Sequence, residues 1–193
     1  CLNAECGITT TLRSVQSQRN LGYEHILKDG MSTDSTLDLI YKFQSERTKV
    51  FSYADDGIYN AFNQALDHCT GEYVNFLGAG DYFINDEILD IVEREIRKFD
   101  CDLLYGDINI FKAHNDRKLL HRKWKAGKFN VWKLKYGWMP PHPSVFVRKS
   151  LFNQIGKFNE DFLISGDYDW LLRVLKLRSL KLKYLNFPLV NME

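Results

Sequence analysis

Short apolar runs alternate with amphipathic segments along most of this chain. Apolar residues at helical spacing predict helices at 9–18, 37–43, 58–69, 87–99 and 167–177. Runs rich in Ile, Leu, Val, Tyr and Phe predict strands at 23–27, 49–53, 73–77, 103–111, 144–147 and 182–190. Because strands and helices take turns, we expect crossover connections. The pattern therefore predicts one α/β domain over 1–193, with a mostly parallel central sheet flanked by helices on both faces.

The segment from Asp55 to Asp81 joins the clearest helix pattern to a buried strand. Paired aspartates precede the helix pattern and Gly71 follows it, as is typical of helix starts and ends. The next apolar run ends in a turn that carries Gly78, Gly80 and Asp81. Ligands of parallel sheets bind beyond the carboxyl ends of strands, and glycines there let the backbone approach a ligand. This turn is therefore the first candidate for the floor of an active site.

Composition disfavours several classes of function. The 193 residues carry 26 Lys and Arg against 25 Asp and Glu, and a net charge of +1 does not favour nucleic-acid binding by the whole molecule. The four cysteines show neither zinc-site spacing nor the density of a disulfide scaffold, so we expect reduced thiols and a cytoplasmic location. No apolar run approaches the roughly 20 residues that span a bilayer.

One stretch departs from this charge balance. Residues 112–135 hold nine Lys or Arg and the single acid Asp116, with Trp124, Phe129 and Trp132 interleaved. Two interpretations stay open. The stretch is either a solvated excursion whose aromatic residues pack back on the sheet, or a less ordered surface that meets anionic lipid headgroups or a pyrophosphate-bearing acceptor.

Five motifs together resemble the inverting GT-A glycosyltransferases of family 2, most closely the bacterial exopolysaccharide, capsule and O-antigen enzymes of the colanic-acid type. They lie at 29–34, 56–63, 76–81, 141–148 and 166–173. The resemblance implies a GT-A fold and an enzyme that moves a sugar from a nucleotide-diphosphate donor, with UDP expected, to a saccharide or lipid-linked acceptor. It also implies a role in cell-surface polysaccharide synthesis.

The resemblance assigns roles to individual residues. Asp167 opens a short helix and is expected to be the general base, since inversion needs one base beside the acceptor hydroxyl and a helix N-terminus stabilises a carboxylate. Its alternative is a plain helix cap. Asp29 is expected to accept the imide N–H of uracil while Asp34 caps or braces the turn, and the alternative is an ordinary Asp-Gly loop. The further donor-side residues are Asn3, Asp56, Asn63, Gly78, Gly80 and Asp81.

The acceptor side is expected to carry His142 and Asp169. His142 has a buried structural histidine as its alternative, and Asp169 has a capping or orienting role. On the donor side, Asn63 has a solvent-facing helix position as its alternative.

The metal site departs from the family pattern. Family members often carry Asp-x-Asp at this strand end, because two acids hold Mn²⁺ or Mg²⁺ against the donor diphosphate. Here Gly78 and Gly80 occupy those positions, so Asp81 is the single candidate ligand. The glycines can let backbone N–H groups approach the phosphates while Asp81 reaches a metal directly or through water, and the alternative is a weak or absent metal site.

The resemblance also bears on domain organisation. Residues 1–111 are expected to form the donor-nucleotide half and 112–193 the acceptor half. The family has a strand before the segment that matches 1–3 and more residues after the last strand, so both ends are expected to be truncated.

Partners and alternative functions follow from the same pattern. We expect a nucleotide-sugar donor, a saccharide or lipid-pyrophosphate-saccharide acceptor, and peripheral contact with the inner face of the cytoplasmic membrane through 112–135. A degenerate member that binds a nucleotide sugar without catalysis is the second hypothesis. Nucleic-acid binding through 112–135 is the third, and the balanced overall charge disfavours it.

Overall fold

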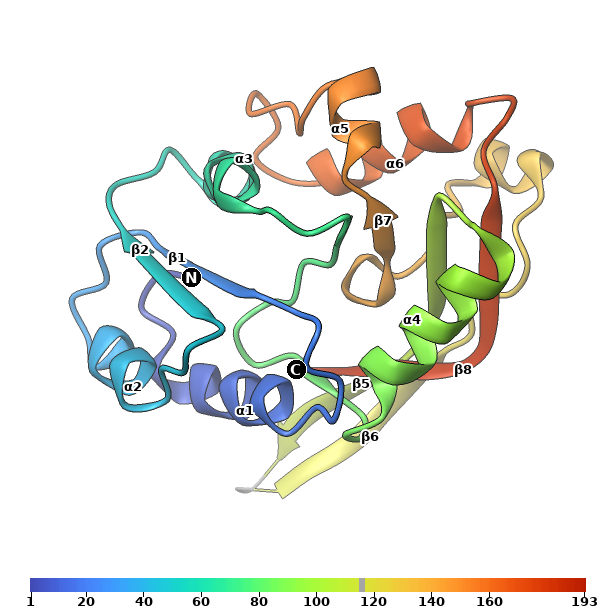
Figure 1. Ribbon diagram of the computed structural model, residues 1–193. Coiled ribbons are helices and arrows are strands. Elements are labelled where there is room, and N and C mark those ends of the chain that lie inside the picture. The colour runs from blue at the N-terminus through green and yellow to red at the C-terminus, as the bar shows by residue number, and fades with distance from the viewer. Residues whose placement is uncertain (115–116) are drawn as a thin grey trace.

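The computed structural model describes residues 1–114 and 117–193 (Figure 1). Its α-helices are α1 (Glu5–Gln16), α2 (Thr36–Lys42), α3 (Ile58–His68), α4 (Ile88–Phe99), α5 (Ser150–Ile155) and α6 (Gly166–Leu175). Its strands are β1 (His25–Asp29), β2 (Thr48–Ser52), β3 (Tyr73–Val74), β4 (Tyr82–Phe83), β5 (Leu103–His114), β6 (Arg117–Trp124), β7 (Phe146–Arg148) and β8 (Leu182–Met192). Two 3-10 turns are η1 (Val131–Tyr136) and η2 (His142–Ser144). All predicted helices are present, whereas α5, β4 and β6 are additional.

The strands form two separate sheets. β1 and β2 are parallel neighbours joined through α2. The larger sheet has the order β3-β7-β5-β8-β4, with β6 paired to the distal part of β5. Within it β5 and β8 are parallel, and the other pairs between described residues are antiparallel. The α/β class is confirmed, but the larger sheet is mixed instead of mostly parallel, since strands such as β5 and β6 meet without a crossover helix.

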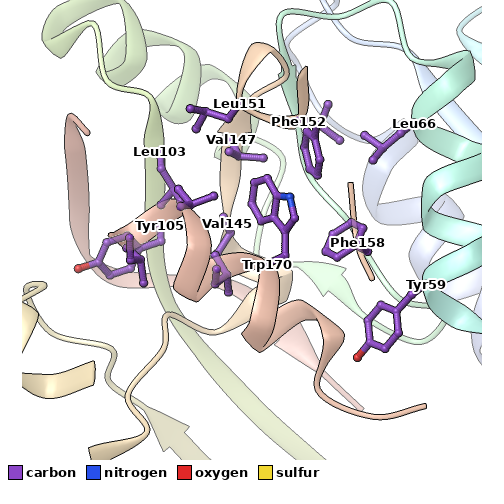
Figure 2. Close-up of a cluster of buried hydrophobic side chains, with 14 of the residues drawn as sticks. Tyr59, Leu66, Leu103, Tyr105, Val145, Val147, Leu151, Phe152, Phe158 and Trp170 are labelled. Atoms are coloured by element: carbon purple, nitrogen blue, oxygen red, sulfur yellow. The ribbon is translucent and has the colours of Figure 1, made fainter. Parts of the chain in front are cut away.

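Helices cover both faces of the larger sheet. Successive residues of a strand point to opposite faces. Leu103 of β5 packs in a core with Trp170 of α6, whereas its neighbour Leu104 packs in a second core with Val92 of α4. Figure 2 shows the first core, where the rings of Trp170 and Phe152 stack with centroids 4.2 Å apart. The predicted flanking of both faces by helices is therefore confirmed.

A smaller core joins α1 and α2 to the parallel pair β1–β2. Ile8 and Leu12 of α1 pack with Leu27 of β1 and Ile40 of α2. A cavity of about 950 Å³, lined in part by Leu27 and Phe76, lies between this unit and the larger sheet. In the described chain no strand pairing bridges the two sheets, and they are linked instead by α1, which contacts β4, and α3, which contacts β1.

The basic segment 112–135 is more regular than expected. β5 and β6 form an antiparallel ribbon in which Ile108 faces Trp124, and η1 follows. Phe129 packs against Trp138, with ring centroids 5.5 Å apart, whereas Trp132 is 63% exposed. Over 117–135 the segment thus contains a strand and a helical turn. Of its aromatic residues, Phe129 packs inward and Trp132 faces solvent, so each of the two interpretations describes part of the segment. Residues 115 and 116 lie outside the described residues.

Candidate active site

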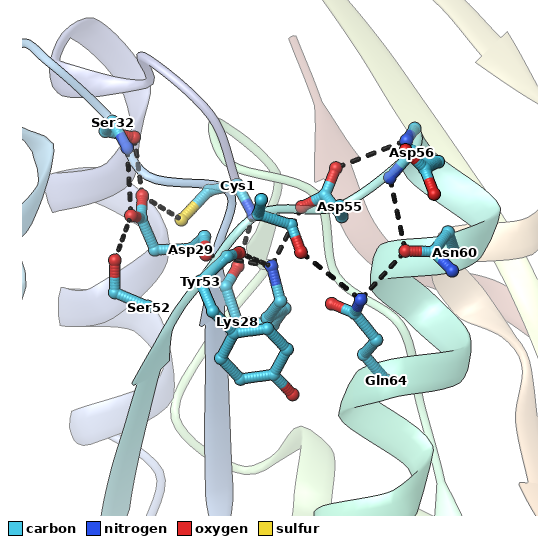
Figure 3. A network of polar contacts seen from close by, with 12 residues as sticks. Cys1, Lys28, Asp29, Ser32, Ser52, Tyr53, Asp55, Asp56, Asn60 and Gln64 are labelled. Carbon is cyan, nitrogen blue, oxygen red and sulfur yellow. Dashed lines mark hydrogen bonds and ion pairs between the residues drawn. The ribbon is translucent and has the colours of Figure 1, made fainter.

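Asp29 closes β1 and is fully buried. Its carboxylate accepts hydrogen bonds from the backbone N–H of Ser32 (3.0 Å) and from the hydroxyls of Ser32 and Ser52, the latter at 2.8 Å (Figure 3). Burial alone would raise the pKa of Asp29, but these hydrogen bonds outweigh it and the pKa is lowered. Three of the roughly four lone pairs of a carboxylate are thus used by the turn. The Cys1 thiol faces the remaining position, with its Sγ 3.9 Å from Asp29 Oδ1, and this is a weak contact that a stronger donor can replace.

A buried lysine lies beside Asp29. Lys28 is 5% exposed, and its Nζ donates to Asp55 Oδ2 at 2.8 Å and to the carbonyls of Asp29 and Tyr53. A buried ammonium needs such full pairing, because an uncompensated charge in the interior is costly. The contact brings Asp55 into the Asp29 network.

Asp55, and not its neighbour Asp56, pairs with Lys28 beside Asp29. Asp56 is exposed, and its backbone N–H donates to Asn60 Oδ1 at 3.2 Å. Figure 3 shows the two neighbours on different sides of the chain. The sequence shows that two adjacent acids precede Gly57. It does not show which of the two faces inward, so Asp55 was not identified. A donor-binding role for Asp56 stays a prediction.

The turn after β1 is tied to the start of α1. The amide oxygen of Asn3 accepts the N–H of Thr33 at 2.9 Å, and the N–H of Asn3 donates to the Ser32 hydroxyl at 2.8 Å. Asp34 accepts the N–H of Glu5 at 3.1 Å and that of the first residue of α2 at 3.0 Å. The predicted bracing role of Asp34 is confirmed. Asn3 is linked to Asp29 through Ser32, which bonds to both residues.

The glycine turn at 78–81 packs against the middle of α1. The Thr11 hydroxyl donates to the carbonyl of Gly78 at 3.2 Å and accepts the N–H of Gly80 at 2.9 Å. A Cβ on Gly7 would lie 2.9 Å from the Gly80 Cα, and Gly80 has a φ of +105°. Only glycine fits such a close approach and such a backbone angle. Helix α1 therefore contacts both turns that were predicted on the donor side, the one after β1 and the one at 78–81.

Asp81 lies beneath this turn and is 8% exposed. Its carboxylate accepts the N–H of Glu193 at 3.3 Å, and burial raises its pKa to about 6.

The four cysteines are free, as expected. Among the described residues no group of three or more His, Cys, Asp or Glu is arranged to hold a metal. The side chains present thus do not form a protein-built metal centre, and Asp81 is a single carboxylate.

Asp167 is the second residue of α6 and is half-buried. The residue that precedes the helix, Ser165, has a left-handed φ of 67° and occupies the cap position. The Asp167 carboxylate accepts the hydroxyl of Tyr59 at 3.2 Å, the one hydrogen bond that it makes with the described residues. Asp167 is therefore not the N-cap residue, and its charge lies at the positive end of the helix dipole.

His142 lies among aromatic rings close to Asp167. Its ring is nearly parallel to that of Phe76, with centroids 5.6 Å apart, and 5.8 Å from that of Phe62. Burial lowers the pKa of His142, and the charge of Asp167 opposes that shift. The imidazole is therefore neutral at neutral pH. The structure brings the two predicted residues together.

Structural contacts occupy two other predicted site residues. Asn63 is 7% exposed, and its amide pairs with both backbone groups of Phe158 (2.9 and 3.0 Å) and with Glu160. Asp169 accepts the Nε of Arg173 at 3.0 Å. Asn63 is thus not solvent-facing, and Asp169 has the contacts of an orienting residue. Ligand-binding roles for both stay predictions.

Sequence comparisons place these features in a family. The profile described as Glycosyl transferase family 2 matches residues 1–156. A PGL/p-HBAD biosynthesis glycosyltransferase of Mycobacterium tuberculosis is 31% identical over 189 residues, which are 96% of this chain and 71% of that protein. An uncharacterized glycosyltransferase of the same organism is 30% identical over 177 residues, 86% of this chain and 63% of that protein.

Solved structures share the fold. S. aureus TarS 1–349 in complex with UDP-GlcNAc has a TM-score of 0.77 at 22% identity, over 98% of this chain and 55% of that one. The mannosyltransferase PcManGT from Pyrobaculum calidifontis, in complex with GDP-Man and Mn²⁺, has a TM-score of 0.68 at 12% identity, over 95% and 52%. The chain thus spans little more than half of these structures, and the likeness confirms the expected GT-A fold. With a family profile that covers most of its length, this chain belongs to the family 2 glycosyltransferases.

Proposed function

We propose that this protein catalyses inverting transfer of a sugar from a nucleotide-diphosphate donor to an acceptor hydroxyl, with Asp167 as the general base. The supporting observation is the half-buried Asp167 carboxylate at the start of α6, held by Tyr59 and close to His142. In this reaction the carboxylate takes the proton of the acceptor hydroxyl while the hydroxyl oxygen attacks the anomeric carbon. The bond to the diphosphate breaks on the opposite face, and the nucleoside diphosphate leaves.

The donor we propose is a UDP-sugar that lies along α1. Beside its bonds to Ser32 and Ser52, Asp29 has a weak contact with the Cys1 thiol, which the imide N–H of uracil can replace. In the glycine turn Gly78 is exposed and offers backbone that can approach a diphosphate, whereas the N–H of the buried Gly80 is bonded to Thr11. Binding of UDP and UDP-GlcNAc by TarS supports this choice. Asp81 is the residue that would hold Mn²⁺ or Mg²⁺ against the diphosphate.

The acceptor we propose is a saccharide or a lipid-linked saccharide of the cell surface. The relative named for PGL/p-HBAD biosynthesis supports a role in assembling surface glycoconjugates. No helix of the described chain is long and apolar enough to cross a bilayer. We propose peripheral membrane contact through 112–135, because Trp132 is exposed there, Lys135 lies 4.4 Å from its ring, and the exposed Tyr136 follows directly.

A donor panel tests the enzymatic proposal. UDP-, GDP- and dTDP-sugars are incubated with the protein, with Mn²⁺ or with EDTA, and release of nucleoside diphosphate is measured beside calorimetric binding of UDP. We expect turnover of a UDP-sugar, and a rate that falls in EDTA and returns with Mn²⁺ if Asp81 serves as a metal ligand. Binding of UDP without turnover of any donor would identify a degenerate binding protein. No binding of any nucleotide would contradict both hypotheses.

Charge reversal tests the membrane proposal. The test variant changes three exposed lysines of the segment to glutamate, namely Lys123, Lys125 and Lys128. The control variant reverses three exposed lysines elsewhere, namely Lys42, Lys98 and Lys176. At low salt the test variant should lose sedimentation with vesicles of anionic phosphatidylglycerol, since each basic residue near the surface contributes about 1 kcal/mol, and should keep its UDP affinity. Equal losses in the two variants would exclude a specific role for 112–135.

A further inference from the structure

Tyr59 lies in the first turn of α3 and reaches the start of α6. Its side chain is 7% exposed, and its hydroxyl donates to Asp167 Oδ1 at 3.2 Å. Burial raises the pKa of Tyr59, and the charge of Asp167 raises it further. The tyrosine is therefore a protonated donor, and the Asp167 carboxylate is the acceptor of its hydrogen bond.

The tyrosine ring also packs against the backbone before Asp167. A Cβ at Gly166 would lie 2.8 Å from the Tyr59 ring, closer than real side chains approach, so the ring contacts the bare backbone there. The rings of Phe158 and Phe62 lie 5.9 and 6.2 Å from that of Tyr59. Figure 2 shows Tyr59 at the edge of the aromatic cluster, with its oxygen directed away from Phe158. Packing therefore fixes the ring and gives the hydroxyl a defined position.

The same helix holds the loop that leads into α6. The amide of Asn63 pairs with the backbone N–H and carbonyl of Phe158, and Asn60 and Asn63 donate to Glu160 at 2.8 and 2.7 Å. These hydrogen bonds lower the pKa of Glu160, with Asn63 the larger cause. Helix α3 thus holds both the incoming loop and the Asp167 carboxylate.

We propose that Tyr59 is a positioning residue for Asp167, and that α3 serves the transfer reaction by orienting this carboxylate. The inference rests on the proposed role of Asp167 as the general base. It also gives a second role to the motif at 56–63, which the sequence resemblance assigns to the donor side alone.

The physical reason lies in the freedom of an aspartate at a helix start. Such a carboxylate can turn back to accept N–H groups of its own first turn, where its oxygens would not face an acceptor hydroxyl. By holding Oδ1, Tyr59 leaves Oδ2 oriented for the acceptor proton. Proton transfer requires an oxygen within hydrogen-bond reach of the hydroxyl, so loss of this orientation lowers kcat more than it affects donor binding.

A double-mutant cycle tests the inference on four proteins: the parent, Tyr59→Phe, Asp167→Asn and the double variant. Tyr59→Phe keeps the ring and removes the donor. We expect kcat to fall about 10-fold, the worth of one hydrogen bond to a charged group, with the donor KM, UDP affinity and melting temperature unchanged. In the Asp167→Asn background the same change should have little further effect, because residues that act through one group are not additive.

Two further variants keep the outcome specific. Tyr73→Phe removes a comparable hydroxyl contact, 2.6 Å to the carbonyl of Cys101, and should leave kcat unchanged. Gly166→Ala displaces the Tyr59 ring and should mimic Tyr59→Phe without adding to it. The inference is overturned if Tyr59→Phe keeps the parent kcat, or loses equally in both backgrounds. If Asp167→Asn itself keeps the parent rate, the proposed base is what has failed, so the two failures are distinguishable.

Discussion

Asp29 and Asp167 are the two acids most important to the proposed reaction, and their surroundings differ sharply. Asp29 is fully buried, and Ser32 and Ser52 supply it with three hydrogen bonds. Asp167 is half-buried and has Tyr59 as its described partner. A carboxylate with several partners holds a turn in place, whereas one with a single partner keeps lone pairs free for a proton. The first acid thus contributes mainly to structure and recognition, and the second is suited to chemistry.

The basic side chains beside these two acids also differ. Beside Asp29, the buried Lys28 is charged and bonded to Asp55 and to two carbonyls. Beside Asp167, His142 is kept neutral by burial among aromatic rings. A neutral neighbour neither forms an ion pair with the base nor uses its negative charge. The contrast predicts that substitutions near Asp29 affect folding, while those near Asp167 affect rate.

The largest expected effect is at Asp167. Asp167→Asn keeps the size of the side chain and an oxygen for the Tyr59 hydroxyl but removes the proton acceptor, so transfer should fall about 10²–10⁴-fold. The melting temperature and UDP affinity should stay at parent values, measured by circular dichroism and calorimetry. Asp161→Asn, at an exposed acid of the preceding loop, is the matched control and should transfer at the parent rate. Parent-level transfer by Asp167→Asn would leave Asp169, or another acid, as the base.

A smaller effect is expected at Asp29, on stability and donor binding instead of on the transfer rate. Asp29→Asn replaces an acceptor oxygen by an N–H₂ group that faces the donors of Ser32 and Ser52, which should lower the free energy of unfolding by about 1–3 kcal/mol. UDP affinity should fall as well. Urea unfolding of this variant beside Asp167→Asn measures the contrast directly. Equal stabilities of the two variants would remove the distinction between a structural and a chemical acid.

The smallest effect is expected at Glu24, just before β1, where the substitution changes how stability depends on pH between 4.5 and 2. Burial would raise the pKa of Glu24, but hydrogen bonds from Lys49, Thr70 and Gly71 lower it from 4.5 to about 2. A depressed carboxylate pKa adds stability that is present above pH 4.5 and lost as the pH falls towards 2. Glu24→Gln should therefore flatten the dependence of unfolding free energy on pH in this window. Parallel curves for parent and variant would show that Glu24 makes no such contribution.

The local structure and most of the polar turns could be predicted from the sequence. Helical and alternating periodicities are properties of neighbouring residues, so the predicted helices formed and Leu103 and Leu104 entered different cores. Asp34 braces the first turn as expected, because its partners include Thr36, two residues away. The family motifs likewise needed no distant contact to be recognised, and the family profile agrees with them.

The way these elements meet could not be predicted, because it depends on contacts between distant parts of the chain. The mixed strand order and the choice of Asp55 over Asp56 depend on partners far along the chain, as do the contacts that occupy Asn63 and Asp169. Tyr59 shows the reason most clearly, since it lies 108 residues from Asp167 in the sequence. The residues around Tyr59 predict an amphipathic helix but give no sign of its partner. Periodicity says which side of a helix is buried. Which buried hydroxyl faces which carboxylate is set by packing between elements, and that packing has no local signal in the sequence.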